Sequence, residues 1–299
     1  MEIKARLDAF CKEYNLSQAQ IAKSIGFSAT YLSKALNQDD FKYKTEVLTK
    51  LEDFLNSFAP KKAQLSSDFI HTIDAKAIFN VIDWVVADGE MGAIIGIAGS
   101  GKTRAIKEYV STHPQALLFE GATTVTPKAL LNALCKLLGL NSVGTSDNVL
   151  RMIANELTRR THILIVDEAE HLNHRCLEIL RRIHDFSSTP LVLVGTNKLL
   201  NNLNGNGKNN YYEYEQLSSR VGSKWILKGL ANDEAMSDLR QVCKAYNVTD
   251  NECINTIYAL ARGNFRSTLK LLNRAKRLNE NISVKTLKNA ASMLLIKGA

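Results

Sequence analysis

The possible folds of this chain are restricted most by a glycine-rich segment, GIAGSGKT, at residues 96–103. The segment matches the pattern GxxxxGK[ST]. It follows an apolar run at residues 92–97 and precedes a helical pattern, which is the context that this phosphate-binding motif requires. Glycines let the backbone approach an anion closely, and the N–H groups at the start of the next helix can point at it. The segment therefore predicts a P-loop.

The residues of this segment have definite expected roles towards ATP. Lys102 would neutralise the β- and γ-phosphates, and the hydroxyl of Thr103 would bind Mg²⁺. The other residues expected to contact ATP are Gly96, Gly99, Ser100, Gly101 and Arg104. The sequence thus predicts ATP and Mg²⁺ as cofactors.

Two carboxylates follow a second apolar run, in the segment ILIVDEAE at residues 163–170. Because the run is typical of a buried strand, Asp167 would lie at its carboxyl end and face the P-loop. Asp167 suits the Mg²⁺ shell, and Glu168 suits activation of the attacking water. This second half of a nucleotide site argues against a chance glycine-rich turn at residues 96–103.

A later apolar run ends in the segment Gly195-Thr196-Asn197. A polar side chain at that strand end would lie between the two motifs, near the γ-phosphate and the attacking water. We therefore expect Asn197 to contribute to catalysis, with an ordinary strand-end cap as the alternative.

Four apolar runs alternate with helical patterns along the middle of the chain. They span residues 92–97, 116–122, 162–169 and 190–196. Unbroken apolar strands separated by helices predict an α/β fold with a parallel sheet covered on both faces. A helix is expected around residues 75–87, a loop at 201–210, and only helices after about residue 230. We expect a nucleotide-binding domain at residues 69–228 and a helical lid at residues 229–299.

The first 58 residues predict a separate, small all-α domain. Its apolar residues at helical spacing are Ile21, Ala22, Ile25, Leu32 and Leu36. Ser17 and Ser28 can cap two short helices, and Gly26 between them can supply the positive φ of a tight turn. This pattern predicts a helix-turn-helix motif. The segment at residues 59–68, which contains proline, lysine and serine, is expected to be a linker.

Further motifs follow in a specific order: VGTN, then LSSRVGSKW at residues 217–225, then RGNFRSTLKLLNRA at residues 262–275. With the P-loop, DEAE and the helix-turn-helix, this order resembles an AAA+ module of the initiator-like group. It is most similar to the phage Mu transposition protein B family of DNA-transposition ATPases, over essentially the whole chain. The resemblance implies a P-loop AAA+ parallel sheet with a helical lid, and an ATPase stimulated by DNA and oligomerisation.

The resemblance also implies partners and two further site residues. The partners are double-stranded target DNA, further copies of the chain in an ATP-dependent filament or ring, and a recruited integrase-type transposase. Arg220, in LSSRV, matches the arginine finger that completes a neighbour's ATP site, and Arg266, in GNFR, matches the sensor-2 arginine. An arginine supplied in trans makes hydrolysis depend on assembly. Each arginine could instead be a surface charge.

Two surfaces are candidates for DNA contact. The early exposed positions of the second helix of the motif, at roughly residues 28–37, are Ser28, Thr30, Tyr31 and Lys34. Because this helix has no arginine and its domain is neutral overall, reading of guanine by arginine is not supported, and DNA binding and partner docking both remain open. The resemblance implies a second surface, inside the assembly, that contacts the DNA backbone. Its candidates are Thr124, Lys128, Arg151, Arg159 and Arg160, the last two of which could equally be a cation pair at a helix end.

Composition excludes several other classes. The formal charge of +8 favours a polyanionic partner. The five cysteines are odd in number and far apart, so neither a disulfide framework nor a zinc site is expected. No stretch reaches the ~18–20 apolar residues of a membrane span. The charged N-terminus has no signal-peptide core, so we expect a cytoplasmic protein. The resemblance implies that it is bacterial or phage-encoded and lies in the host cytoplasm.

Two alternatives to a transposition ATPase remain open. One is a replication-initiator or helicase-loader ATPase of the same fold, and the other is an ATP-regulated helix-turn-helix transcription factor. A two-lobed DEAH-type helicase is excluded, because 299 residues with one P-loop cannot supply two RecA-like lobes.

Overall fold

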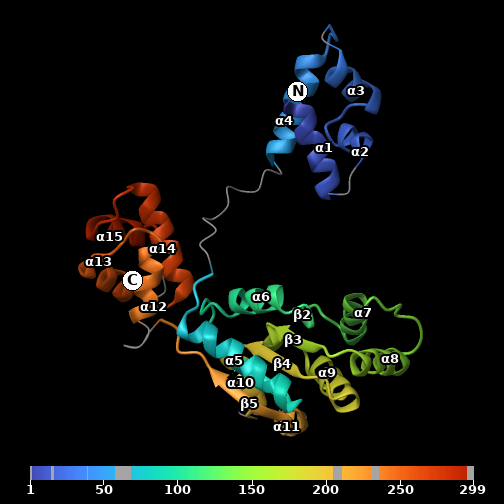
Figure 1. Cartoon of the computed structure of the whole chain (residues 1–299), viewed down its shortest axis with the longest axis vertical. Coiled ribbons are helices and arrows are strands. Elements are labelled where there is room, and N and C mark those ends of the chain that lie inside the picture. The colour runs from blue at the N-terminus through green and yellow to red at the C-terminus, as the bar shows by residue number, and fades with distance from the viewer. Residues whose placement is uncertain are drawn as a thin grey trace. The chain divides into compact units, whose positions relative to one another are not determined.

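The computed structural model describes residues 2–14, 17–38, 40–57, 69–204, 211–230 and 236–294. The chain forms two compact units, Met1–Asp68 and Phe69–Ala299 (Figure 1). The expected linker at residues 59–68 lies outside the described residues. None of the described helices is long and apolar enough to cross a membrane.

The first unit consists of helices over its described residues: α1 (Glu2–Tyr14), α2 (Gln18–Ser24), α3 (Ala29–Asn37) and α4 (Lys44–Ser57). Both caps of the helix-turn-helix form as expected. Ser17 caps α2 in a reciprocal capping box with Gln20, and Ser28 caps α3 by accepting a hydrogen bond from the backbone N–H of Tyr31. Gly26, in the turn between them, has φ 81°, which confirms its role there.

A small apolar core holds this helix-turn-helix together. Helices α1 and α4 cover α2 and α3 on the side away from solvent, and the fully buried members of the core include Leu7, Ile21, Ala22, Leu32 and Leu51. Two short helices cannot bury enough surface alone, so the flanking helices supply the rest of the core.

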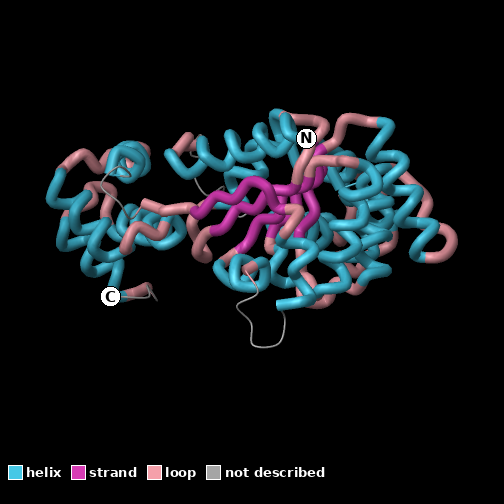
Figure 2. Tube along the Cα trace, turned by 90° about the horizontal axis from the view of Figure 1, so that it is seen from below, coloured by secondary structure: helices cyan, strands magenta, loops and turns pink. Residues whose placement is uncertain are grey.

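The second unit contains a parallel sheet, whose strands are magenta in Figure 2. Its strand order is β2-β3-β4-β1-β5. Its strands are β1 (Met91–Ile95), β2 (Ala116–Glu120), β3 (Ile163–Asp167), β4 (Leu191–Gly195) and β5 (Val221–Ile226). The first four confirm the apolar runs of the sequence. The fifth was missed, because β5 is an edge strand whose residues alternate between half-buried and exposed positions and include Gly222 and Lys224.

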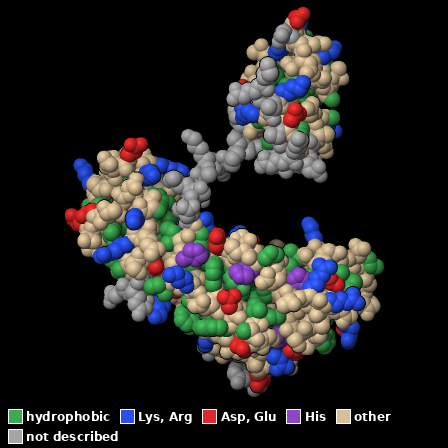
Figure 3. All heavy atoms as spheres, viewed as in Figure 1, with side chains coloured by type: hydrophobic (Ala, Val, Ile, Leu, Met, Phe, Trp, Pro, Cys, Tyr) green, Lys and Arg blue, Asp and Glu red, His purple; other side chains and the backbone are tan. Residues whose placement is uncertain are grey.

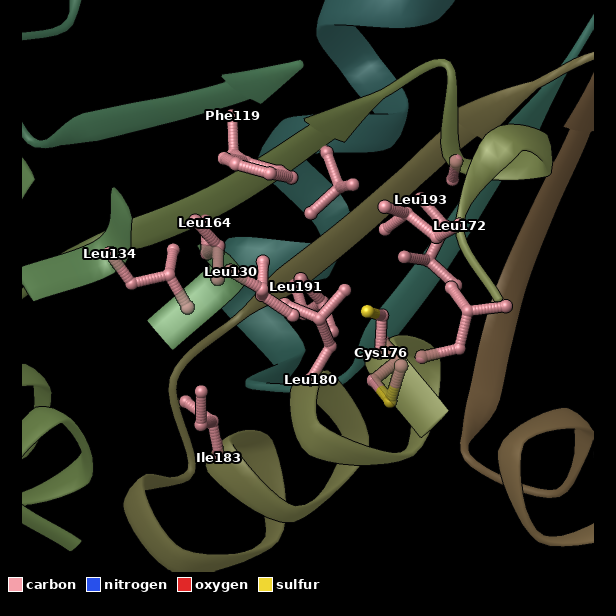
Figure 4. Close-up of a cluster of buried hydrophobic side chains, with 14 of the residues drawn as sticks. Phe119, Leu130, Leu134, Leu164, Leu172, Cys176, Leu180, Ile183, Leu191 and Leu193 are labelled. Carbon is pink, nitrogen blue, oxygen red and sulfur yellow. The ribbon is translucent and has the colours of Figure 1, made fainter. Parts of the chain in front are cut away.

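Helices cover both faces of the sheet. One face packs against α5 (Ile73–Asp88) and α6 (Lys102–Thr112). The other packs against α7 (Pro127–Leu138), α8 (Ser146–Arg159), α9 (His174–Ser187), α10 (Asn197–Leu203) and α11 (Tyr211–Ser218). Neighbouring strand residues point to opposite faces. Leu191 and Leu193 of β4 pack on the face covered by α7–α11 (Figure 4). Val192 and Val194 pack on the face covered by α5 and α6.

One local prediction in this unit was wrong. Residues 201–203 are the last turn of α10 and are not a loop, because Leu199 and Leu203 are buried against the sheet and extend the helix past its asparagines. Residues 205–210 lie outside the described residues.

A helical lid follows the sheet, as expected. Its described helices are α12 (Met236–Lys244), α13 (Asn251–Ala261), α14 (Phe265–Leu278) and α15 (Val284–Ser292), and they share an apolar cluster of their own. The expected α/β fold, with a parallel sheet, a helical lid and a preceding helix-turn-helix domain, is therefore confirmed.

Two carboxylates, the half-buried Asp74 and the buried Asp238, tie the lid to the start of α5. Asp74 accepts hydrogen bonds from the backbone N–H groups of Lys228 (3.2 Å) and Gly229 (2.6 Å), and Asp238 of α12 accepts one from Ile73 N (2.7 Å). Burial raises the pKa of both carboxyls. The segment leaving β5 and the first lid helix are thus held by the helix that precedes the P-loop.

Candidate nucleotide-binding site

The carboxyl ends of three neighbouring strands form the edge of the sheet at which the predicted motifs meet. Strand β4 pairs with β1 on one side, with Gly195 opposite Ile95, and with β3 on the other. The P-loop leaves β1, and Asp167 is the last residue of β3. In open parallel sheets, this edge is where ligands bind.

The backbone of the P-loop requires its glycines. Gly99 and Gly101 have φ of 84° and 99°, in the left-handed region. A Cβ on Gly96 would lie 2.9 Å from both Leu227 Cδ1 and Ser100 Oγ. Gly101 is the N-cap of α6 and offers no side-chain cap, so the first N–H groups of this 11-residue helix are open to an anion.

Lys102 lies within this loop and is only 8% exposed. Its Nζ donates hydrogen bonds to the carbonyl oxygens of Gly96 (2.7 Å) and Ile97 (3.1 Å). Burial lowers the pKa of Lys102, while the charges of Glu170 and Asp167 act in the opposite direction. The ammonium group is therefore fixed in position by the loop and balanced by two acids.

The two carboxylates of the DEAE segment have different surroundings. Asp167 is 2% exposed, and its Oδ1 accepts a hydrogen bond from Glu168 N (2.9 Å). Glu168 is exposed and adopts φ 52°, a left-handed conformation that costs a non-glycine residue energy and is common at functional sites. This backbone kink turns the two neighbouring carboxylates to different environments.

The residues present fit Mg²⁺ bound together with a nucleotide. Among the described residues, no group of three or more His, Cys, Asp or Glu side chains could hold a metal alone. Mg²⁺ is usually held by one or two protein oxygens, with phosphate and water completing its octahedron. Asp167 and the half-buried Thr103 supply such a donor set.

Glu170 is a site residue that the sequence did not single out. It lies in the short 3₁₀ turn η1 (Ala169–His171), is 7% exposed, and its Oε2 is buried without a hydrogen-bond partner among the described residues. A Cβ on Gly195, at the end of β4, would lie 2.6 Å from this oxygen. Of the three DEAE carboxylates, Glu170 raises the pKa of Lys102 the most. The second Glu of DEAE was the only signal of it in the sequence.

Asn197 lies just beyond the same strand end. It is the first residue of α10, and Thr196 rather than Asn197 caps the helix through Lys198 N. The Asn197 side chain is exposed. Its catalytic role remains a prediction.

The lid reaches the P-loop directly. Asn264 Nδ2 donates to Ala98 O (2.8 Å), and Arg266 N donates to Gly99 O (3.0 Å). Asn264 also caps α14 by accepting from Ser267 N. The start of α14 therefore places Arg266, whose side chain is exposed, beside the phosphate loop. An Asn before a helical pattern is an N-cap signal, but the contact with Ala98 cannot be deduced from it.

Comparison with known proteins extends these observations. A family model described as an AAA domain matches residues 87–203. DNA transposition protein B of the Mu-like prophage FluMu of Haemophilus influenzae is 27% identical over 266 residues, or 87% of this chain and 91% of that protein. The ATP-dependent target DNA activators B of Escherichia phages Mu and D108 are 24% and 25% identical, each over 93% of this chain and 87% of the relative. The chain is a homologue of these transposition proteins B. The resemblance seen in the sequence is confirmed.

The AAA match and the transposition protein B homologues support ATP binding and ATPase activity in general. Within residues 87–203 lie the P-loop, the DEAE segment and Asn197, whereas Arg220 and Arg266 lie beyond it. The roles of both arginines remain predictions.

Arg220 lies between α11 and β5, with about half of its side chain exposed. Its Nε donates to Asp185 Oδ1 at the end of α9 (2.9 Å). Among the described residues, it forms no hydrogen bond or ion pair with the P-loop of its own subunit.

The basic residues expected to contact DNA differ in how they are paired. Arg151 pairs with Asp147 (3.0 Å) within α8, and Arg160, the C-cap residue of α8, pairs with Glu156 (2.9 Å). Arg159 is exposed and forms no ion pair with a described carboxylate, and the same is true of Lys128 at the start of α7. Thr124 is exposed just before α7. Figure 3 shows lysines and arginines interspersed with acidic side chains on the visible face.

In the helix-turn-helix domain, the predicted contact residues Thr30 and Lys34 are exposed, whereas Ser28 serves as the cap of α3. Tyr31 is 41% exposed and belongs to an aromatic group. Its ring stacks on Phe27 (centroids 6.4 Å apart) and meets Phe41 edge-on (5.5 Å). DNA contact by these residues remains a prediction.

Proposed function

We propose that this protein is an ATP- and Mg²⁺-dependent ATPase that assembles on double-stranded target DNA in its ATP-bound form. In this state it recruits and activates an integrase-type transposase, in the cytoplasm of a bacterial host. The observation that carries the proposal is the buried pair of Lys102 and Asp167 at one sheet edge, in a homologue of proteins named ATP-dependent target DNA activators.

Each residue of the site has a task in phosphoryl transfer. Lys102 and the N–H groups at the start of α6 bind the phosphates, and Asp167 with Thr103 would hold Mg²⁺, which neutralises the developing charge. Glu168, exposed at the kink after β3, orients and deprotonates the attacking water. Asn197 and Arg266 contribute polar contacts to the γ-phosphate from α10 and the lid.

Hydrolysis depends on assembly because Arg220 acts in trans. In the part of the chain that the structure describes, its guanidinium forms no hydrogen bond or ion pair with its own P-loop, and we assign it to the ATP site of the neighbouring subunit. Stabilisation of the transferred phosphoryl group then exists only across an interface between two subunits. DNA stimulates the ATPase because it brings subunits together.

DNA binding tests the central claim. Affinity for duplex DNA should require ATP, fall steeply with salt and vary little with sequence, with a log–log salt slope of about −0.9 per neutralised phosphate. Lys102→Ala should abolish ATP binding and, with it, DNA binding. Salt-independent binding would contradict assembly on the DNA backbone. Strong preference for one short site would favour an ATP-regulated transcription factor instead.

Mixing two variants tests the trans arrangement. Arg220→Ala should bind ATP normally and hydrolyse it poorly on DNA, whereas Lys102→Ala carries an intact arginine and a defective pocket. Provided that Lys102→Ala subunits still join ATP-bound Arg220→Ala subunits on DNA, some interfaces combine an intact pocket with an intact arginine, so activity should exceed that of either variant alone. If co-assembly is verified by crosslinking and no activity returns, Arg220 acts within its own subunit or has no catalytic role.

A further inference from the structure

Arg220 lies at one end of a network of ion pairs that joins α9 to the segment just before β5. Its Nε donates to Asp185 Oδ1 at 2.9 Å, and Oδ2 of the same carboxylate accepts from Arg181 Nη1. Arg181 also forms two hydrogen bonds with Glu178, of 2.6 and 2.8 Å. Asp185 therefore connects an arginine anchored on α9 with an arginine just before β5.

The two arginines of this network differ in burial and in the donors that they use. Arg181 is only 12% exposed, and its Nε, Nη1 and Nη2 all donate to carboxylates of its own helix. Arg220 is 48% exposed and uses only Nε. Its terminal nitrogens, Nη1 and Nη2, have no partner among the described residues. They are the donors with which an arginine binds phosphate oxygens.

The carboxylate between the two arginines is ionised and held in place. Burial opposes its ionisation, but the hydrogen bond from Arg220 and the charge of Arg181 outweigh burial and lower the pKa of Asp185. A half-exposed ion pair of this kind contributes little to folding stability. Its effect is to restrict the rotamers of a long side chain, which otherwise carries large rotamer entropy.

We propose that Asp185 is a positioning residue for hydrolysis in the neighbouring subunit: it holds Arg220 by Nε and leaves Nη1 and Nη2 directed at the neighbour's transferred phosphoryl group. The proposal rests on the trans role of Arg220 given above. Arg181 and Glu178 anchor Asp185 and do not touch the reacting atoms.

Three substitutions separate positioning from a general disturbance of α9. Asp185→Ala removes the acceptor, and Asp185→Asn keeps a carbonyl oxygen that can still accept from Nε. Glu178→Gln is the matched control, because it weakens the anchoring of Arg181 and leaves the pair between Asp185 and Arg220 intact. Circular dichroism and thermal melting verify folding of each variant.

DNA-stimulated ATPase kinetics provide the main test. Asp185→Ala should lower kcat roughly 10- to 100-fold with unchanged KM and unchanged ATP affinity, since small misplacements of catalytic groups have effects of this size. Asp185→Asn should recover most of the lost kcat. In Glu178→Gln, kcat should fall less than about threefold, which is below the smallest effect expected for Asp185→Ala. Wild-type kcat in Asp185→Ala, or an equal loss in Glu178→Gln, would overturn the proposal.

Combination with Arg220→Ala distinguishes the two levels of the argument. The double variant Asp185→Ala/Arg220→Ala should be no slower than Arg220→Ala, because a positioning residue has no effect without the group that it positions. A further loss in the double variant would show that Asp185 acts elsewhere. Wild-type activity in Arg220→Ala would instead overturn the trans role of Arg220 itself.

Mixed assemblies give an independent readout. Asp185→Ala has an intact pocket and a defective finger, so it should recover activity when mixed with Glu168→Gln, which binds ATP and joins the assembly, keeps Arg220 and cannot hydrolyse its own ATP. It should not recover activity when mixed with Arg220→Ala, since both variants lack a positioned finger. Recovery in the second mixture would show that Asp185 serves the ATP site of its own subunit, which contradicts the proposal.

Discussion

The contact between the lid and the P-loop can be tested by adding one methyl group at Gly99. The backbone of Gly99 has φ 84°, and a left-handed conformation costs a residue with a Cβ about 1–2 kcal/mol. The added Cβ would also lie 2.7 Å from Asn264 Oδ1 and 2.9 Å from Arg266 Cβ. Because Arg266 Cβ belongs to the start of α14, relief requires the loop or the lid helix to shift.

The expected magnitude follows from these two effects. Overpacking costs about 1–3 kcal/mol. Together with the left-handed backbone, Gly99→Ala should therefore lower the free energy of unfolding by about 2–5 kcal/mol. Gly139→Ala is the matched control, since Gly139 has φ 70° and nothing within 4 Å of an added Cβ. The control should lose only the backbone share, about 1–2 kcal/mol.

Urea unfolding followed by circular dichroism measures both variants, and titration with a fluorescent ATP analogue measures the site. Gly99→Ala should also weaken ATP binding, about tenfold if 1.4 kcal/mol of the strain is relieved by moving the loop. Gly139→Ala should bind ATP as the wild type does. Equal destabilisation by the two substitutions, with ATP affinity unchanged in both, would refute the contact between lid and loop.

Three further predictions test individual side chains. Asn264→Asp keeps the helix cap but cannot donate to Ala98 O. Hydrogen exchange of the lid amides should therefore be faster, with an opening free energy that is lower by about 0.5–1.5 kcal/mol. Unchanged exchange would contradict the bond. Glu168→Gln should bind ATP and Mg²⁺ but hydrolyse about 10²–10⁴-fold more slowly, whereas Glu170→Gln should mainly change ATP affinity by altering the charge balance of the P-loop lysine. Titration with ATP and single-turnover hydrolysis separate the two variants. Equal ATP affinities and equal hydrolysis rates would contradict the different roles of Glu168 and Glu170. Because burial raises the pKa of Asp238 above 3.8, its stabilising contribution is complete below pH 3.8 and is lost as the pH rises through the folded-state value. The free energy of unfolding of Asp238→Asn should thus rise relative to that of the wild type as the pH rises through that range. Urea unfolding at several pH values measures it, and a pH-independent difference would contradict the prediction.

The parts of the fold that could be predicted are those whose signals are local in sequence. The P-loop is a strand, a turn and a helix start within a dozen residues, so its glycines and Lys102 could be assigned directly. Strands β1, β3 and β4 are buried along their whole length, and together with the partly buried β2 they form unbroken apolar runs in the sequence. Strand β5 has a solvated edge and an alternating pattern with Gly222, so the same criterion failed there.

The parts of the site that could not be predicted depend on local backbone geometry or on distant pairs. The sequence places Glu168 and Glu170 in one acidic segment, and only the left-handed backbone at Glu168 decides that the first is exposed while the second is buried. The bond between Arg220 and Asp185 spans 35 residues, and that between Asn264 and Ala98 spans 166. No periodicity or motif specifies such pairs.

The lid is bonded both to α5 and to the P-loop, and these two sets of bonds explain how the P-loop and the lid can act together. At one end, Asp74 and Asp238 fix the segment after β5 and the start of α12 to α5. At the other, Asn264 and the backbone of Arg266 hold the carbonyl oxygens of the P-loop. A helical cluster held at both ends can follow a movement of the loop only if one set of bonds shifts or breaks, and the bond from Asn264 to the loop is more exposed than those that Asp238 and Asp74 accept from Ile73 and Gly229. Any phosphate that changes the backbone of residues 98–99 must therefore change the bonds that hold α14, and with them the position of Arg266.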